Sequence, residues 1–316
     1  MAGIKVCKYV YGRLQSPNLD QAEEFLTNFG MVRAERTPTR LYMRGTDAEP
    51  HIHITELGSA KPVAFGYYAR SEDDLKTLAK LPGASGIENV DEPGGGKRVR
   101  LTDPNGFGIE VLHGQAKAPP LPMSEYKVNW AEDKYRRREL MRLPQGPAPV
   151  KCAAHGVIAT PEFKKSLQWY RETLGFISSD DIYGGSKDNI FASFNRLNNG
   201  PEYVDHHVFF ILTGPRAGLN HLSYESRDID SIFIGHNVLK AKGYKHMWGI
   251  GRHVLGSQVF DYWQDPWGRV HEHWADSDVL NETSGSNLLT PEEGLYNQWG
   301  PDIPQEFLEH ITPFSG

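Results

Sequence analysis

The sequence predicts an α+β protein of two domains, each built from a pair of βαβββ modules. Two internal echoes point to this duplication. "SPNLDQAEEFLTNFGM" (16–31) reads as an amphipathic helix that ends at Gly30, and "TPEFKKSLQWYRETLGF" (160–176) repeats the plan with Pro161 early and Gly175 late. "LTDPNGFGIEVLHG" (101–114) matches "WQDPWGRVHEHWAD" (263–276), since in both an Asp-Pro-x-Gly turn leads into an alternating strand.

A third, weaker echo lies within the two halves. It pairs "GYYARSEDDLKTLAK" (66–80) with "HLSYESRDIDSIFIGHNVLKAKG" (221–243), each a strand that runs into a helix through serine. Units that repeat at this length indicate duplicated supersecondary modules. We therefore predict an N-terminal domain over 1–115, a Pro-rich and charged linker over 116–149, and a second domain over 150–276. Residues 277–316 hold Leu, Tyr, Trp and Phe among turn residues, which predicts a tail packed on the body.

The totals restrict the class of partner. At 316 residues with 39% hydrophobic residues, the chain has enough apolar residues for a sizeable core. A net charge of −6 argues against nucleic acid or an anionic membrane as the main partner, because both favour basic surfaces. Two cysteines, no long apolar run and no secretory signal at the N-terminus predict a cytoplasmic protein without a disulfide framework.

Three side chains of the second half form a candidate metal site. His155 stands on the first strand of that half, His221 begins another strand, and Glu272 lies on the last. Two imidazoles and one carboxylate on one face leave three adjacent coordination positions open, which suits Fe(II) chemistry in which substrate and O₂ share the metal. Because side chains alternate along a strand, Glu272 faces away from His271 and His273, which we expect to be supporting or surface groups.

The surrounding motifs carry a family resemblance. The stretches are "HGVIAT", "DHHVFF", "NHLSYE", "GRHVLGSQVFDYWQDP" and "GRVHEHW". With them the chain resembles the type I extradiol catechol dioxygenases of the vicinal oxygen chelate superfamily, in which two domains of paired βαβββ modules occur and only the second holds iron. The resemblance covers the whole chain, but residues 150–276 give it specificity.

The resemblance assigns roles to six residues. It implies that the ligands of Fe(II), or of Mn(II) with the same preferences, are His155, His221 and Glu272. It further implies that His207 is the acid–base histidine, whereas His253 and Tyr262 hydrogen-bond the substrate oxygens. The implied reaction is insertion of O₂ into a catechol beside its hydroxyl groups, in a homo-oligomer.

The first half is expected to be a structural copy. Aligning Pro17 with Pro161 places Tyr11 opposite His155, and aligning Ser71 with Ser226 places Gly66 opposite His221. Only Glu110 keeps a ligand type, so this half is not expected to bind the metal in the same way.

Other histidines have ordinary structural explanations. His51 and His53 in "HIHIT" are expected to share a strand face, but no carboxylate partner is evident, so a structural role is favoured. His206 is expected to point away from His207, as a packing or supporting group.

Two other function classes stay open at this point. One is a metal-dependent isomerase or lyase of the same superfamily, which typically takes four ligands from two modules. The other is a non-catalytic binding protein without the ligand set. Within the dioxygenase class, alkyl catechols, bicyclic diols and trihydroxylated aromatics are all open, and the tail either seals the second domain or covers the metal pocket.

Overall fold

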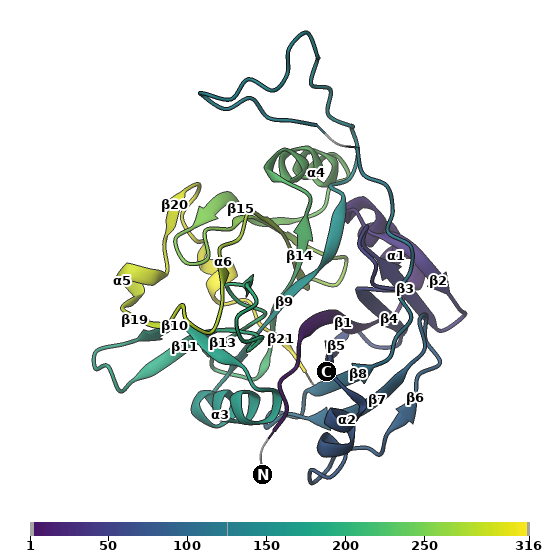
Figure 1. The fold of residues 1–316 in the computed structure, drawn as a ribbon, viewed down its shortest axis with the longest axis vertical. Helices are drawn as coiled ribbons and strands as arrows, with labels where there is room; N and C mark the ends of the chain where they lie inside the picture. Colours follow the sequence, from purple (N-terminus) through teal and green to yellow (C-terminus); the bar gives the residue numbers. More distant parts are fainter. Residues whose placement is uncertain (1–2, 125, 315–316) are drawn as a thin grey trace.

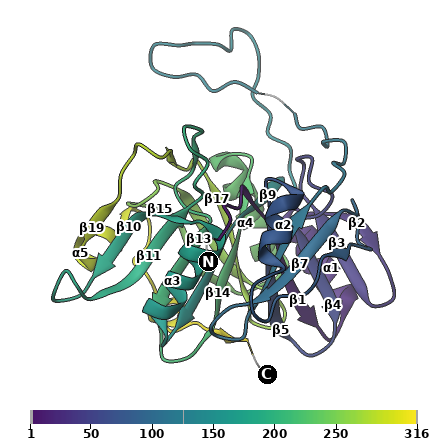
Figure 2. The same ribbon diagram turned by 60° about the horizontal axis from the view of Figure 1, so that its bottom comes forward.

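Two mixed sheets lie side by side in the computed structural model, which describes residues 3–124 and 126–314 (Figures 1 and 2). The N-terminal half builds the first sheet, and the C-terminal half with the tail builds the second. No helix among the described residues is long and apolar enough to cross a membrane.

The first sheet has eight strands in the order β2-β3-β4-β1-β5-β8-β7-β6. Its elements are β1 (Lys8–Ser16), α1 (Leu19–Phe29), β2 (Val32–Arg36), β3 (Arg40–Arg44), β4 (His53–Leu57), β5 (Lys61–Tyr68), α2 (Glu72–Leu78), β6 (Glu88–Asn89), β7 (Lys97–Thr102) and β8 (Gly108–His113). The chain therefore runs twice through strand, helix and three strands, with β1 and β5 adjacent at the centre.

The second sheet repeats this order and extends it. Its modules are β9 (Val150–Thr160), α3 (Phe163–Leu174), β10 (Ile177–Tyr183), β11 (Ile190–Arg196) and β13 (Phe209–Thr213), then β14 (Gly218–Ser226), α4 (Ile229–Ala241), β15 (His246–His253), β16 (Val259–Gln264) and β17 (Val270–Ala275). The order β10-β11-β13-β9-β14-β17-β16-β15 matches the first sheet strand for strand. The predicted paired βαβββ modules are confirmed.

The tail adds one short strand to each end of the second sheet and a third to its central strand β14. It comprises β18 (Val279–Leu280), which pairs with β12 (Val204–Asp205), then β19 (Asn287–Leu289), α5 (Pro291–Gly294), β20 (Asn297–Trp299), α6 (Gln305–Leu308) and β21 (Thr312–Pro313). β19 pairs with β10, β20 with β15 and β21 with β14. The tail therefore runs from one edge strand of the sheet to the other and ends on the central strand (Figure 1).

Local capping chemistry sets the helix ends. The Asn18 side chain accepts hydrogen bonds from the first turn of α1, and Gly30 ends that helix with φ 112°, a left-handed conformation that favours glycine. Gly175 ends α3 in the same way with φ 76°. Ser71 caps α2, whereas Asp228 caps α4.

These caps correct one alignment between the halves. Because Ser71 corresponds to Asp228 and not to Ser226, Gly66 corresponds to Ser223. The strand register agrees, since Gly66 pairs with Tyr11 and Glu110 just as Ser223 pairs with His155 and Glu272. The counterpart of His221 is therefore Ala64, which offers no metal ligand either.

Buried histidines fill the contact between the halves. His273 Nε2–H donates to the Phe29 carbonyl at 2.6 Å, and the two rings stack with centroids 3.7 Å apart. His271 packs edge-on against Phe25. The expectation that His271 and His273 are surface groups is wrong, because the first half covers this face of β17.

The pair His51 and His53 also differs from expectation. His53 hydrogen-bonds the Tyr224 hydroxyl at 2.6 Å across the contact between the halves. His51 lies before β4 begins and packs against Tyr11 inside the first sheet. The two do not share a strand face, because the regular alternation starts only at His53.

Between the sheets, residues 116–149 form no helix, and strand structure resumes only at Val150, in the part that the structure describes. Residues after Tyr126 project from the body as a long arm, drawn in teal (Figures 1 and 2). Tyr126 anchors the arm at its base through a hydrogen bond to Asp228, and Arg227 lies over its ring.

We predict that acid weakens the contact between the halves. Burial lowers the pKa of both His271 and His273 to about 4, against about 6.5 for an exposed histidine. The unfolded chain therefore binds more protons, so stability is complete above about pH 6.5 and falls as pH drops towards 4. Each of these two histidines should lower the free energy of unfolding by up to about 2 kcal/mol between pH 6.5 and pH 5.

Urea unfolding of the metal-free protein between pH 7.5 and 5 measures this loss. His273→Gln should reduce the pH dependence of the free energy of unfolding by about one proton. Equal pH dependence in His273→Gln and wild type would contradict the assignment.

Candidate active site

Three buried side chains meet at the base of a cavity in the second sheet. His155 lies on β9, His221 on β14 and Glu272 on β17, three neighbouring strands. Glu272 Oε2 lies 3.0 Å from His155 Nε2 and 3.6 Å from His221 Nε2, and the two Nε2 atoms are 3.3 Å apart. The exposed fractions are 2%, 6% and 1% for His155, His221 and Glu272, so the group is almost sealed from solvent.

Register explains the convergence. Ser223 of β14 pairs with His155 on one side and with Glu272 on the other. His221 stands two residues before Ser223 on β14, so strand alternation places it on the same face as His155 and Glu272. His155 and Glu272, more than 110 positions apart along the chain, are thus brought together by β14, which lies between their two strands.

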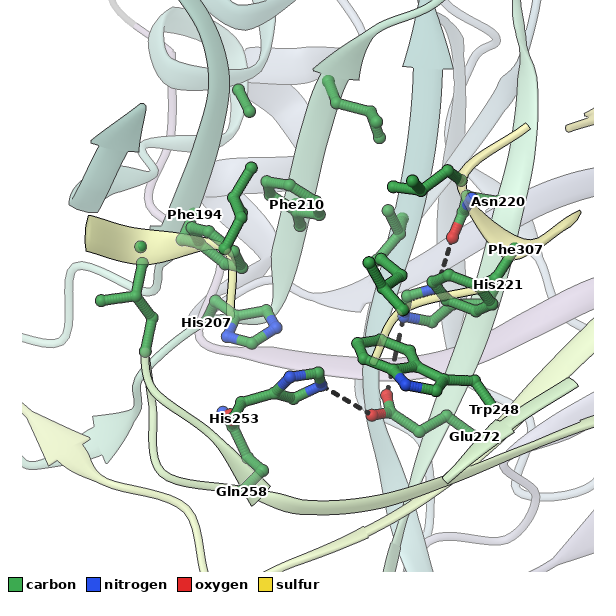
Figure 3. A pocket seen from close by; sticks show the side chains of 18 of the residues that line it. Phe194, His207, Phe210, Asn220, His221, Trp248, His253, Gln258, Glu272 and Phe307 are labelled. Atoms are coloured by element: carbon green, nitrogen blue, oxygen red, sulfur yellow. Dashed lines mark hydrogen bonds and ion pairs between the residues drawn. The ribbon is translucent and has the colours of Figure 1, made fainter. Parts of the chain in front are cut away.

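Asn220 orients His221 and was not found by sequence reasoning. Its Oδ1 accepts from His221 Nδ1–H at 2.6 Å, which leaves the His221 Nε2 lone pair directed at the cavity (Figure 3). The Asn220 amide in turn donates to the carbonyl of His310 in the tail at 2.9 Å. Strand alternation predicts that neighbours 220 and 221 face opposite ways, so the sequence held no signal for this contact.

The charge states suit metal binding. Burial alone raises a carboxyl pKa, but the neighbouring imidazoles, His155 first and then His221 and His253, outweigh burial and lower the pKa of Glu272 to about 2. Burial lowers the pKa of His221 to about 3, against the opposing charge of Glu272. At pH 7 the site therefore presents a carboxylate and a neutral imidazole, the forms that bind metal ions.

Glu272 Oε2 is buried and accepts no hydrogen bond from any described residue. The ligand atoms of the three residues all lie within 4.8 Å of one another, which is the spacing that one ion can span. A buried carboxylate oxygen without a donor is costly, and a bound cation removes that cost. The set of two nitrogens and one oxygen fits Fe(II) or Mn(II).

His207 lines the same cavity beside the three ligand candidates. Its ring centroid lies 4.3 Å from that of His155, and its Nδ1 lies 3.1 Å from His206 Nδ1. His206 Nε2–H donates to Asp180 at 2.6 Å. With a neutral His206, its Nδ1 accepts from His207 Nδ1–H, which leaves the Nε2 lone pair of His207 free.

His206 thus supports His207 rather than facing away from it. The two residues follow β12 in a bend, not in a regular strand, so strict alternation does not apply to them. Burial and then the neighbouring His155 lower the pKa of His207 well below its ordinary value, so the imidazole is neutral.

His253 and Tyr262 form the opposite wall. His253 Nε2 lies 3.1 Å from the Tyr262 hydroxyl and 3.9 Å from Glu272 Oε1. His253 stacks on Phe260 with centroids 4.0 Å apart, which fixes its ring plane. Burial lowers the pKa of His253 to about 4 and raises that of Tyr262, so both groups are uncharged at neutral pH.

Apolar side chains form most of the remaining cavity wall, as Figure 3 shows in part. One side comes from β11 and β13, and the other comes from β15 and the tail: Phe191, Phe194, Phe210, Leu212, Trp248, Leu295, Ile303, Phe307 and Leu308. Phe307 packs against Tyr262 with centroids 4.6 Å apart. The tail therefore covers the cavity as well as the edges of the sheet.

An ion-pair cluster occupies the corresponding place in the first half. Tyr11 donates to Glu110 at 2.5 Å, and Arg13 Nη2 lies 2.8 Å from Glu110 and 2.7 Å from Glu92. Arg98 Nη1 lies 3.2 Å from Glu92. A guanidinium group supplies the positive charge there, so Glu110 is not available as a metal ligand.

Comparisons with known proteins agree with this architecture. Residues 153–272 match the model of the Glyoxalase/Bleomycin resistance protein/Dioxygenase superfamily. Metapyrocatechase 2 of Cupriavidus necator is 30% identical over 94% of this chain and 90% of its own length. The manganese-dependent 2,3-dihydroxybiphenyl 1,2-dioxygenase of Geobacillus genomosp. 3 is 24% identical over 98% and 95%, and the iron-dependent extradiol dioxygenase of Rhodococcus jostii is 22% identical over 93% and 96%.

Solved structures share the fold. The Mn(II)-bound glyoxalase from Novosphingobium aromaticivorans superimposes with a TM-score of 0.82 at 23% identity, covering 99% of this chain and 97% of its own. Homoprotocatechuate 2,3-dioxygenase from Brevibacterium fuscum, in an anaerobic complex with 3,4-dihydroxyphenylacetate, gives 0.79 at 15% identity, covering 98% and 94%. At these identities the likeness establishes the fold alone.

We predict a graded loss of metal along this set of residues. His221→Ala or Glu272→Ala should abolish metal binding, because each removes a ligand. Asn220→Ala keeps every ligand but frees the His221 ring, so metal affinity should fall by ~10- to 100-fold. Competition with a chelating dye measures the affinity.

Two controls accompany this series. Asn28→Ala removes an amide that bonds only the Tyr244 hydroxyl, and His53→Ala removes a buried histidine of the other half. Both should bind metal as the wild type does, whatever they do to stability. If Asn220→Ala binds metal as tightly as Asn28→Ala, Asn220 has no orienting role.

Proposed function

The chain belongs to the extradiol ring-cleaving dioxygenases of the Glyoxalase/Bleomycin resistance protein/Dioxygenase superfamily, and we propose that its active centre is His155, His221 and Glu272 in the second half. The protein is thus an oxidoreductase that inserts both atoms of O₂ into a catechol and depends on Fe(II) or Mn(II). The observation that carries the residue assignment is the convergence of three buried ligand atoms within 4.8 Å at the base of one cavity.

The metal, when bound, brings catechol and O₂ together and passes electron density between them. The contribution of the chain begins with geometry. Three ligands on one side leave the cavity side free for substrate and O₂, and near-complete burial excludes water that would compete for those positions.

We assign proton transfer to His207. Its neutral imidazole lines the cavity, and the contact with His206 leaves Nε2 with a lone pair. This atom is suited to take a proton from a catechol hydroxyl and to return it to a reduced oxygen later in the reaction. Asp180 accepts from His206 and so holds the supporting ring in place.

We assign substrate orientation to His253 and Tyr262. The Tyr262 hydroxyl and His253 Nε2 line the same cavity as His207 and are already hydrogen-bonded to each other. A catechol oxygen that enters between them meets one donor and one acceptor. Stacking on Phe260 keeps the His253 ring from turning away.

The cavity wall supports a catechol with an apolar ring substituent. Among the described residues, no lysine or arginine lines the cavity, and phenylalanines and leucines make up the distal wall. A carboxylated side chain would be buried there without a cationic partner, which costs several kcal/mol. An alkyl or aryl substituent gains from burial instead.

The isomerase or lyase alternative finds less support in the site. In the first half, Tyr11 and Arg13 on β1 are bonded to Glu110 on β8, so this glutamate is not available as a fourth ligand. The likeness to the Mn(II)-bound glyoxalase concerns the fold and does not distinguish the reactions.

Cytoplasmic location and homo-oligomer formation stay predictions. Cys7 and Cys152 are both free thiols, which supports the first. The arm supports the second, since Trp130 and Leu140 are 65% and 75% exposed on a segment away from the body. Sedimentation as a single chain would contradict the oligomer.

The proposed function predicts ring fission with a preference for apolar catechols. The test is anaerobic loading with Fe(II), then addition of 3-methylcatechol, 2,3-dihydroxybiphenyl or 3,4-dihydroxyphenylacetate and air. The first two should give a yellow ring-fission product with one O₂ consumed per product. Their kcat/KM should exceed that of the carboxylated compound by ~100-fold or more, since each 1.4 kcal/mol of unpaired charge burial is tenfold.

Absence of O₂ uptake with every catechol would contradict the reaction, whereas a preference for 3,4-dihydroxyphenylacetate would contradict only the substrate class.

Replacement of His207 should separate chemistry from binding. His207→Asn is expected to keep the metal and to bind catechol without air, yet to lower kcat by ~10²- to 10⁴-fold. Single-turnover absorbance after mixing with O₂ measures the loss, and His113→Asn on β8 of the first half is the control. Wild-type turnover in His207→Asn would move the proton-transfer role to another group.

A further inference from the structure

A second cluster of two histidines and one aspartate lies on the other face of the second sheet. His236 stands on α4, His246 begins β15, and Asp261 lies on β16. Asp261 directly precedes Tyr262, so strand alternation directs its side chain away from the cavity. None of the three residues lines that cavity.

The cluster has the dimensions of a metal site. His236 Nδ1 lies 3.1 Å from Asp261 Oδ2, and His246 Nε2 lies 2.8 Å from Asp261 Oδ1. One ligand atom from each residue can be chosen so that all three lie within 4.8 Å. These separations resemble those of His155, His221 and Glu272 in the same molecule.

Access and support are both present. The side chains of His236 and His246 are 20% and 32% exposed, so an ion and water can reach them from solvent. Asp261 is fully buried, and the Trp263 indole N–H donates to its Oδ2 at 2.6 Å. Such an outer hydrogen bond to a ligating carboxylate fixes its orientation in metal sites.

The charge on Asp261 lacks a permanent partner. Among the described residues, neither a lysine nor an arginine forms an ion pair with it, and its charged neighbours are His236 and His246 alone. Burial raises the pKa of this carboxyl group, but hydrogen bonds from the two histidines outweigh the effect and lower it. The buried Asp261 carboxylate therefore depends on His236, His246 and the Trp263 indole for its polar contacts.

We propose that His236 Nδ1, His246 Nε2 and an oxygen of Asp261 bind a second divalent ion of the zinc class, with water as the fourth ligand. Two imidazoles and one carboxylate in a tetrahedral arrangement are a common zinc donor set. The ion neutralises the Asp261 carboxylate. Its bonds to the two imidazoles and to the carboxylate take the place of the present hydrogen bonds between His236, His246 and Asp261.

This ion is structural rather than catalytic. It joins α4 to the start of β15 and to β16, and the same two strands carry His253 and Tyr262 at the active centre. Its occupancy therefore stabilises the hairpin that holds the substrate-orienting residues. The inference stands independently of the reaction proposed above.

Zinc stoichiometry tests the site, with chelator-treated full-length protein titrated with Zn²⁺ alone. The wild type should bind two ions per chain by calorimetry and elemental analysis. His221→Ala, which removes the active-centre ligand, and His246→Gln should each bind one, and the double variant none. Zn²⁺ should raise the Tm of His221→Ala but not that of the double variant.

His246→Gln is the decisive variant because its side chain is partly exposed and its loss is not expected to prevent folding, whereas Asp261→Asn alters a buried group. If His246→Gln binds the same number of ions as wild type, or if His221→Ala binds none, the second site does not exist. If His221→Ala keeps two ions while His246→Gln loses one, the second site stands and the active-centre assignment fails.

Discussion

The negative charge of Glu272 is the constraint on which the second half depends. Its carboxylate lies inside the sheet with 1% exposure, a position that is unfavourable unless cations or donors surround it. His221 lies on β14, the strand next to β17, and His155 lies on the following strand, β9. Both face Glu272 Oε2, whereas His253 lies nearer to Oε1. The ring nitrogens of His155, His221 and His253 lie 3.0, 3.6 and 3.9 Å from the carboxylate oxygens of Glu272.

The two halves solve the same problem by different chemistry. Each places a glutamate at the same register position, Glu110 in one and Glu272 in the other, paired with the centre of the neighbouring strand. In the first half Arg13 supplies a fixed positive charge within the protein. In the second half imidazole rings take the place of the guanidinium group, and the arrangement of His155, His221 and Glu272 is one that an ion can bridge. A duplicated fold thereby yields one rigid support and one reactive centre.

Much of this was predictable because the relevant signals are local. Helix caps, Asp-Pro-x-Gly turns and alternating strands repeat along the chain, and the six candidate residues chosen from motif and resemblance all line one cavity. The wrong predictions concern features that depend on contacts between residues far apart in the sequence. The offset between Ser71 and Asp228 shifted one alignment by two residues, and the burial of His271 and His273 depends on α1, which lies more than 240 positions earlier. Asn220 was missed because regular strand alternation would direct it away from His221, whereas a hydrogen bond to His310, 90 residues later, holds its amide.

The bond between Asn220 and the His310 carbonyl makes the orientation of His221 depend on a segment that is synthesised later than all three candidate ligands. His155, His221 and Glu272 leave the ribosome well before His310, and the earlier modules are free to fold first. Until β21 pairs with β14, Asn220 lacks its hydrogen bond to the His310 carbonyl, and Phe307 does not cover the cavity beside His221. A chain cut before residue 303 would therefore keep His155, His221 and Glu272 but lose the part of the cavity wall that Ile303, Phe307 and Leu308 form.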